Sequence, residues 1–120
     1  MLTTINLAEK FGWFNDQWSP KVVAELNDNH VLLAKVQGEF VWHQHEGEDE
    51  LFLVLKGTLI IELRDGQVVL GPGEMIVIPK GTEHRPVAME EVHLMLIEPK
   101  VTRHTGNVES ERTVHQYGRV

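Results

Sequence analysis

Three side chains that can bind a metal lie in the run from Gly38 to Gly57. His43 and His45 are two residues apart, and residues i and i+2 of a β-strand project from the same face. Glu50 follows a short acidic loop and opens an apolar run, so its carboxylate can return beside the two imidazoles. Imidazole is the commonest metal ligand, and this set suits any divalent first-row metal. The alternative is a half-exposed strand face beside a solvated acid.

A fourth candidate ligand stands in a second segment, Gly73–His84, which reads GEMIVIPKGTEH. The turn Pro79-x-Gly81 re-aims the chain between two strands, and His84 follows three residues later. If the sheets close into a barrel, this imidazole can meet the other three side chains inside. Buried without partners, such groups would cost about 1–3 kcal/mol each. A metal would turn that cost into binding free energy coupled to folding.

The strands that must hold these residues are predicted between Lys21 and Pro99. Short apolar runs alternate there with turn residues, and helical periodicity is nearly absent. The pattern predicts strands over 22–26, 31–36, 40–45, 51–55, 58–63, 68–70, 75–78, 84–88 and 92–97, with a turn at 89–91. Asp65-Gly66 is a strong hairpin signal. Many short, turn-punctuated strands are typical of an all-β sandwich or barrel.

The two ends of the chain carry weaker patterns. Residues 1–20 are predicted to form an aromatic arm with a short helix from Leu7 to Phe11. Its aromatic residues indicate either a lid packed on the barrel or a contact between subunits. Residues 101–120 form a polar tail, either an ordered arm or a partly disordered one. His104, in this tail, lies outside any motif and is expected to be solvated.

Length and composition favour a single soluble domain. With 120 residues and 42% hydrophobic content, the chain can bury one globular core. The absence of cysteine excludes disulfides and thiolate metal ligands. The formal net charge of −7 disfavours nucleic acid as a partner. No apolar run is long enough for a membrane helix, and no signal-peptide pattern is present, so we expect a cytoplasmic protein.

The two histidine segments together resemble the cupin family. The first cupin motif is a glycine, His-x-His, a glutamate and a second glycine, and the second motif is a glycine, Pro-x-Gly and a histidine. The matching residues here are Gly38, His43, His45, Glu50, Gly57, Gly73, Pro79, Gly81 and His84. Gly38 lies one residue closer to His43 than is usual, and Ala88 replaces an asparagine, but the four ligand positions are intact.

The resemblance implies a cupin-type jelly-roll, or double-stranded β-helix, barrel over residues 21–100. It also implies one divalent transition metal (Fe, Mn, Zn, Ni or Cu) held by three histidines and one glutamate. Cupins similar to this chain include dioxygenases and sugar-phosphate isomerases. One hypothesis is therefore a metal-dependent oxidoreductase or isomerase acting on a small organic substrate in the barrel. The alternative is a non-catalytic small-molecule or metal-binding module.

The residues predicted to line a substrate pocket follow mainly from the alternation of side chains along a strand. They are Phe52, Val54, Pro86, Ala88 and Met95. Phe52 and Val54 share the face of Glu50, although both can equally be plain core residues. The apolar set favours a small or aromatic organic ligand. The sequence offers no clear catalytic acid or base, because His93 is more typical of a surface or hydrogen-bonded core residue.

The sequence also predicts a homodimer, because cupins commonly pair through their sheets. Trp42 is expected to face outward from the first histidine strand, and together with the N-terminal aromatic residues it is a candidate contact.

Overall fold

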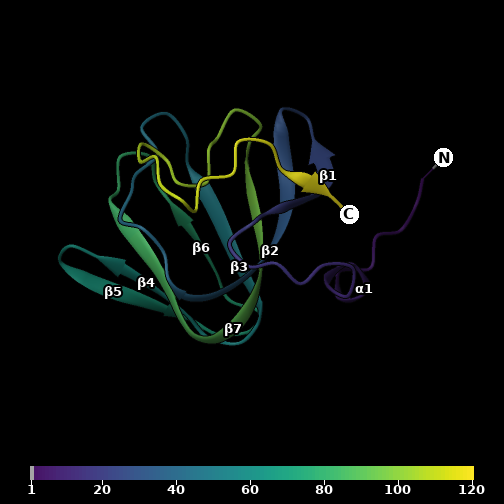
Figure 1. Ribbon diagram of the computed structural model, residues 1–120, viewed down its shortest axis with the longest axis horizontal. Coiled ribbons are helices and arrows are strands. Elements are labelled where there is room, and N and C mark those ends of the chain that lie inside the picture. Colours follow the sequence, from purple (N-terminus) through teal and green to yellow (C-terminus); the bar gives the residue numbers. More distant parts are fainter. Residues whose placement is uncertain (1) are drawn as a thin grey trace.

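The computed structural model describes residues 2–120, which form a β-barrel with a short helical arm (Figure 1). The helix α1 (Leu7–Phe11) precedes the strands. These are β1 (Lys21–Leu26), β2 (Asn29–Glu39), β3 (Glu50–Lys56), β4 (Leu59–Leu63), β5 (Gly66–Leu70), β6 (Met75–Ile78), β7 (His84–Pro99) and β8 (Gly118–Arg119). The predicted all-β barrel is confirmed. No helix in the described residues has the length and apolar character needed to cross a bilayer.

Strand β7 connects the two halves of the barrel. Its first residues pair with β4, and the rest of the strand lies between β2 and β3, always antiparallel. The strand order is β5-β4-β7-β2-β1-β8, and β6 joins through β3. The separate strands predicted at 84–88 and 92–97 are therefore one. Met89, predicted to lie in a turn, is 80% exposed but keeps an extended backbone.

The first histidine segment differs from its prediction. A regular strand is expected over 40–45, but only His43 forms a bridge there, and its partner is His84. The His43 N–H donates to the His84 carbonyl over 3.0 Å, and the His84 N–H donates back over 2.9 Å. These two bonds hold the segment against the start of β7. They also place two of the candidate ligands side by side.

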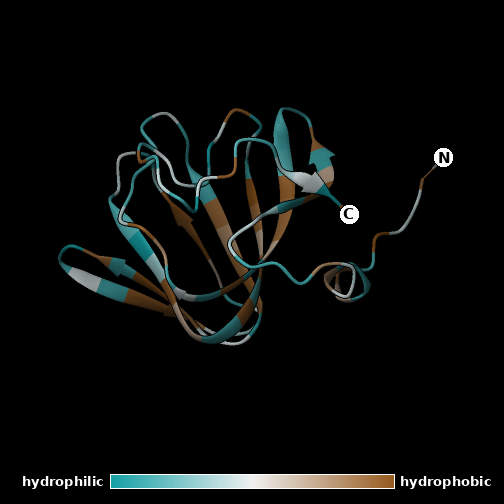
Figure 2. Cartoon of the chain, viewed as in Figure 1, coloured by the Kyte–Doolittle hydropathy of each residue, from teal (hydrophilic) through white to brown (hydrophobic). Residues whose placement is uncertain are grey.

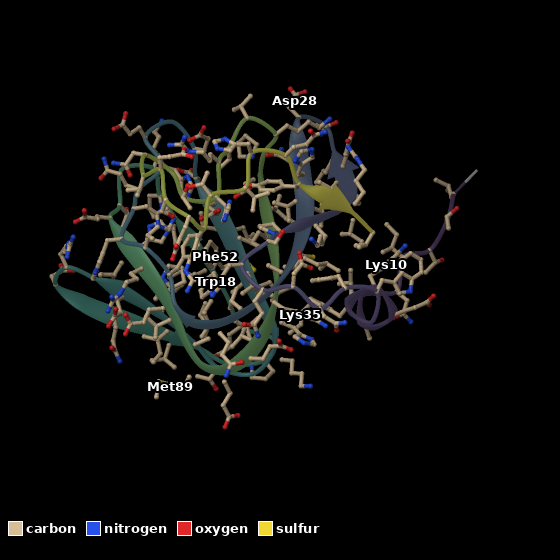
Figure 3. The ribbon with its side chains drawn as sticks, in the orientation of Figure 1. Lys10, Trp18, Asp28, Lys35, Phe52 and Met89 are labelled. Atoms are coloured by element: carbon tan, nitrogen blue, oxygen red, sulfur yellow. The ribbon has the colours of Figure 1, made fainter. Side chains whose placement is uncertain are left out.

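Three of the four aromatic residues of the arm are buried, at two separate sites, whereas Trp13 is exposed. Phe11 and Phe14 are buried with Leu33 in a small cluster outside the sheet. Trp18 instead enters the barrel interior and stacks on Phe40, with 4.6 Å between ring centroids. Figure 3 shows Trp18 near Phe52 in the middle of the molecule. The main core fills this interior, and hydrophobic residues follow β2, β3 and β6 in Figure 2.

Residues 100–117, which we call the C-terminal strap, cross one end of the barrel as irregular chain (Figure 1). The strap is bonded to the first histidine segment, because Asn107 and Gln44 exchange two hydrogen bonds of 3.0 Å. β8 then adds to β1 in parallel. The expectation that His104 is solvated is wrong, since this side chain is 7% exposed.

Candidate metal centre

Four buried side chains meet at one end of the barrel interior. His43 and His45 come from the extended segment before β3, Glu50 opens β3, and His84 opens β7. Each offers a ligand atom, and these atoms all lie within 4.8 Å of one another. The four residues are between 0 and 4% exposed. The structure thus brings together the residues that the two sequence motifs single out, although they are far apart in the chain.

Backbone carbonyls fix the orientation of two of the imidazoles. His43 Nδ1 lies 2.8 Å from the Val41 carbonyl, and His84 Nδ1 lies 2.8 Å from the Thr82 carbonyl. A carbonyl can only accept, so each Nδ1 carries the proton and each Nε2 keeps its lone pair. A metal ligand is typically held in this way, with the second ring nitrogen donating to the backbone.

Burial favours the metal-binding state of the histidines. It lowers the pKa of His43 to about 3 and that of His84 to about 4, and the pKa of His45 falls for the same reason. The neighbouring imidazoles lower the pKa of His43 further. All three are therefore neutral at pH 7, which ligation requires.

Three candidate ligand atoms have no hydrogen-bond partner in the protein, which supports a fit to a cation. They are His45 Nε2, Glu50 Oε1 and His84 Nε2. Glu50 Oε1 lies 3.2 Å from His45 Nε2 and 3.9 Å from His84 Nε2. Each buried polar atom left unpaired costs about 1–3 kcal/mol. A divalent metal at their meeting point would satisfy all of them.

A small cavity lies beside this centre, and the predicted pocket residues divide around it. The volume of this cavity is about 40 Å³. Phe52 and Pro86 line the cavity, whereas Val54 and Ala88 are fully buried core. The prediction for Met95 is wrong, because this side chain packs outside the barrel in the cluster of Phe11 and Phe14. On either side of Met95 in β7, Leu94 and Leu96 line the cavity instead.

Two buried polar residues near the centre have no counterpart in the sequence prediction. Glu98, on the inner face of β7, is 1% exposed and lies beside Glu50. Burial raises the pKa of both carboxyl groups, and the charge of Glu50 raises that of Glu98 further. His104, from the C-terminal strap, lines the cavity, and burial lowers its pKa to about 4. Strand parity with Leu94 and Leu96 could have indicated Glu98, but no local signal indicates His104.

Comparison with known proteins places this fold and site in a family. The family model described as a cupin domain matches residues 29–100. The chain belongs to the cupin domain family.

Two curated relatives match the chain over about half its length. The uncharacterized protein YdbB of Bacillus subtilis (strain 168) is 47% identical over 64 residues, which cover 52% of this chain and 57% of that protein. An acireductone dioxygenase of Rhodopseudomonas palustris (strain TIE-1) is 36% identical over 64 residues, which cover 50% of this chain and 36% of the dioxygenase. The match therefore spans between about a third and just over half of these relatives.

Solved structures resemble the chain over a larger part of its length. A cupin-2 domain containing protein from Shewanella frigidimarina NCIMB 400 is 55% identical, with a TM-score of 0.79, over 80% of this chain and 94% of that one. Protein NMB1881 from Neisseria meningitidis is 29% identical, with a TM-score of 0.74, over 82% and 100% of the two chains. KdgF from a Halomonas species is 30% identical, with a TM-score of 0.59, over 68% and 79%.

Proposed function

We propose that this cupin binds one divalent transition metal and uses it to act on a small organic substrate in the barrel. The proposed ligands are His43, His45, Glu50 and His84. The observation that supports this most is the convergence of their four buried ligand atoms within 4.8 Å. Three imidazoles and one carboxylate suit Fe, Mn, Zn, Ni or Cu. A metal bound there would supply a Lewis acid or a redox centre for the reaction.

The cavity supports a small, mostly apolar substrate. Phe52 and Pro86 form part of its wall, and His43 and Glu50 open onto it from the metal centre. Such a wall excludes water from the reacting group and holds a carbon skeleton by contact rather than by charge. The protein residues thus bind and orient the substrate beside the proposed metal.

A dioxygenase is the reaction class that we favour over an isomerase. The support is the 36% identity to acireductone dioxygenases over a matched stretch that covers about half of this chain. A non-catalytic binding module is the second candidate. It is favoured by the small number of titratable side chains in the cavity wall. Apart from the candidate ligands His43 and Glu50, the titratable residue in this wall is His104.

The test combines metal analysis with oxygen uptake. Elemental analysis of the purified protein identifies a resident metal, with His84→Ala as the variant that removes one ligand. Oxygen consumption is then measured for the Fe(II)- and Mn(II)-loaded proteins with diketones, flavonoids and thiols. We expect one metal per chain, lost in the variant, and uptake with one substrate class. A folded protein that takes up no transition metal would overturn the proposal. Metal binding with ligand-induced thermal stabilisation but no turnover would favour the binding module.

A further inference from the structure

The buried side-chain polar atoms that lack a hydrogen-bond partner fall into two neighbouring groups within residues 2–120. The first group is the metal centre. Glu98 lies beside Glu50 and belongs with the first group, so the second group consists of Thr102 and His104 in the C-terminal strap. Because each unpaired buried atom costs about 1–3 kcal/mol, a bound ligand that supplied a partner to a member of this group would be stabilised.

His104 is the member of this second group that reaches the cavity. Its ring stacks on Phe40 with 5.4 Å between centroids, and Phe40 contacts the ring of His43 at the same distance. Neither ring nitrogen of His104 has a hydrogen-bond partner of normal geometry, although the backbones of Trp18 and Arg112 lie near enough to favour its protonated form. In the cavity wall it is a polar group separate from the candidate metal ligands.

We propose that His104 hydrogen-bonds one oxygen of a small organic ligand whose other oxygen binds at the metal centre. This inference rests on the proposed function. The ligand class is a short, mostly apolar molecule with two separated oxygen functions, such as a hydroxy acid or a hydroxy ketone. A neutral imidazole donates from one nitrogen and accepts at the other, so it can bind a hydroxyl or a carbonyl. The apolar wall, with Phe52 and Leu96, contacts the carbon chain between them.

The experiment uses two probes of equal size that differ only at the far end. Butyrate ends in a methyl group, and 3-hydroxypropionate has a hydroxyl in its place. Each is titrated into the Co(II)-loaded protein at pH 7, and the visible absorption of Co(II) reports binding. The variants are His104→Phe, which removes both nitrogens, and His104→Gln, which keeps a donor and an acceptor. The control is His115→Gln, since His115 lies in the same strap but its side chain is 67% exposed.

We expect wild type and His115→Gln to bind 3-hydroxypropionate about 3–10-fold more tightly than butyrate, the worth of one hydrogen bond. His104→Phe should lose this preference while retaining its cobalt affinity, and His104→Gln should keep part of it. A wild-type protein with no preference would overturn the inference, as would a folded His104→Phe protein that binds cobalt and keeps the wild-type preference. Failure of the wild type to bind cobalt would instead overturn the metal centre, and the inference with it.

Discussion

At the scale of single residues, substitution of Glu50 is expected to change metal affinity and the stability of the metal-free protein in opposite directions. We expect Glu50→Gln to weaken metal affinity by at least about tenfold. Loss of a residue that hydrogen-bonds a metal ligand typically costs about tenfold or more, and loss of the ligand itself should cost no less. The metal-free variant should be more stable than metal-free wild type, since a buried carboxyl with a raised pKa is replaced by a neutral amide.

These opposite effects are measured by calorimetric metal titration and by thermal unfolding after chelator treatment. Glu83→Gln is the matched control, because Glu83 is exposed and ion-paired with Arg64, and it should change neither quantity. A Glu50→Gln protein that binds metal as wild type does would show that the carboxylate is not a ligand.

The buried histidines predict how the metal-free protein responds to pH. They are His43, His45, His84 and His104, and burial lowers the pKa of each below the unfolded value of 6.5. Above pH 6.5 these histidines are neutral in both the folded and the unfolded chain, so they do not make the free energy of unfolding depend on pH. Below pH 6.5 the unfolded chain binds protons that the folded chain does not, so the free energy of unfolding falls by about 1 kcal/mol per histidine and pH unit.

The raised pKa values of Glu50 and Glu98 act in the opposite direction, but four histidines outnumber two carboxyl groups. The expected net result is a melting temperature that falls between pH 7 and 5, measured by circular dichroism in the presence of a chelator. Saturating metal should raise the melting temperature but leave this dependence in place, because the imidazoles are already neutral in the metal-free folded chain and the unfolded chain still binds the protons. A flat profile without metal would contradict the burial of these groups.

At the scale of elements, the C-terminal strap fixes the metal-binding segment. Gly106 has a positive φ of 59°, and a Cβ there would lie 2.2 Å from the Gln44 carbonyl oxygen, between two candidate ligands. We expect Gly106→Ala to shift the strap, to lower stability by about 1–3 kcal/mol and to weaken metal affinity.

Gly38→Ala is the matched control for this prediction. Gly38 also has a positive φ, of 88°, but a Cβ there meets no atom within 4 Å. It should therefore lose stability through backbone strain while its metal affinity stays near that of wild type. Thermal unfolding and metal titration of both variants measure the difference. Equal metal affinities in the two variants would show that the strap does not position the histidines.

At the scale of the whole molecule, one outer face of the sheet is apolar across four strands. Two rows of cross-strand neighbours form this outer apolar face: Val77, Leu51, Ile97 and Val31 in one, and Met75, Leu53, Met95 and Leu33 in the other. Neither row contains a charged residue. The arm covers the end at Leu33, but Met75 and Val77 at the β6 edge remain 56% and 47% exposed.

We expect a second copy of the chain to pack on this face. A self-complementary patch is what a two-fold homodimer requires, and an uncharged sheet face buries well against its own copy. Trp42, the sequence candidate for this contact, suits it less well, because Arg64 lies 3.8 Å from its ring centroid. Val77→Glu should convert a dimer to a monomer in light scattering at micromolar concentration. The control is Val69→Glu on β5, where the side chain is 52% exposed but lies outside the face. A wild-type monomer would contradict the expectation.

The sequence by itself indicated most of the strands, an all-β sandwich or barrel and the four candidate ligands, although the strand predicted over 40–45 did not form. These follow from local rules, because a period of two places His43 beside His45 and turn residues mark where strands end. The matched spacing of the two motifs then indicated that His84 joins the first three. Local parity also predicted that Phe52 faces inward, as it does.

The tertiary structure alone decided what surrounds those ligands. Met95 faces out and Leu94 faces in because the pairing of β7 with β2 and β3 sets which face meets the core, and no short pattern reports that choice when both faces are apolar. His104 reaches the cavity because the strap folds back over the barrel. That return depends on contacts such as Asn107 with Gln44, between residues distant in the chain, which local propensity does not encode.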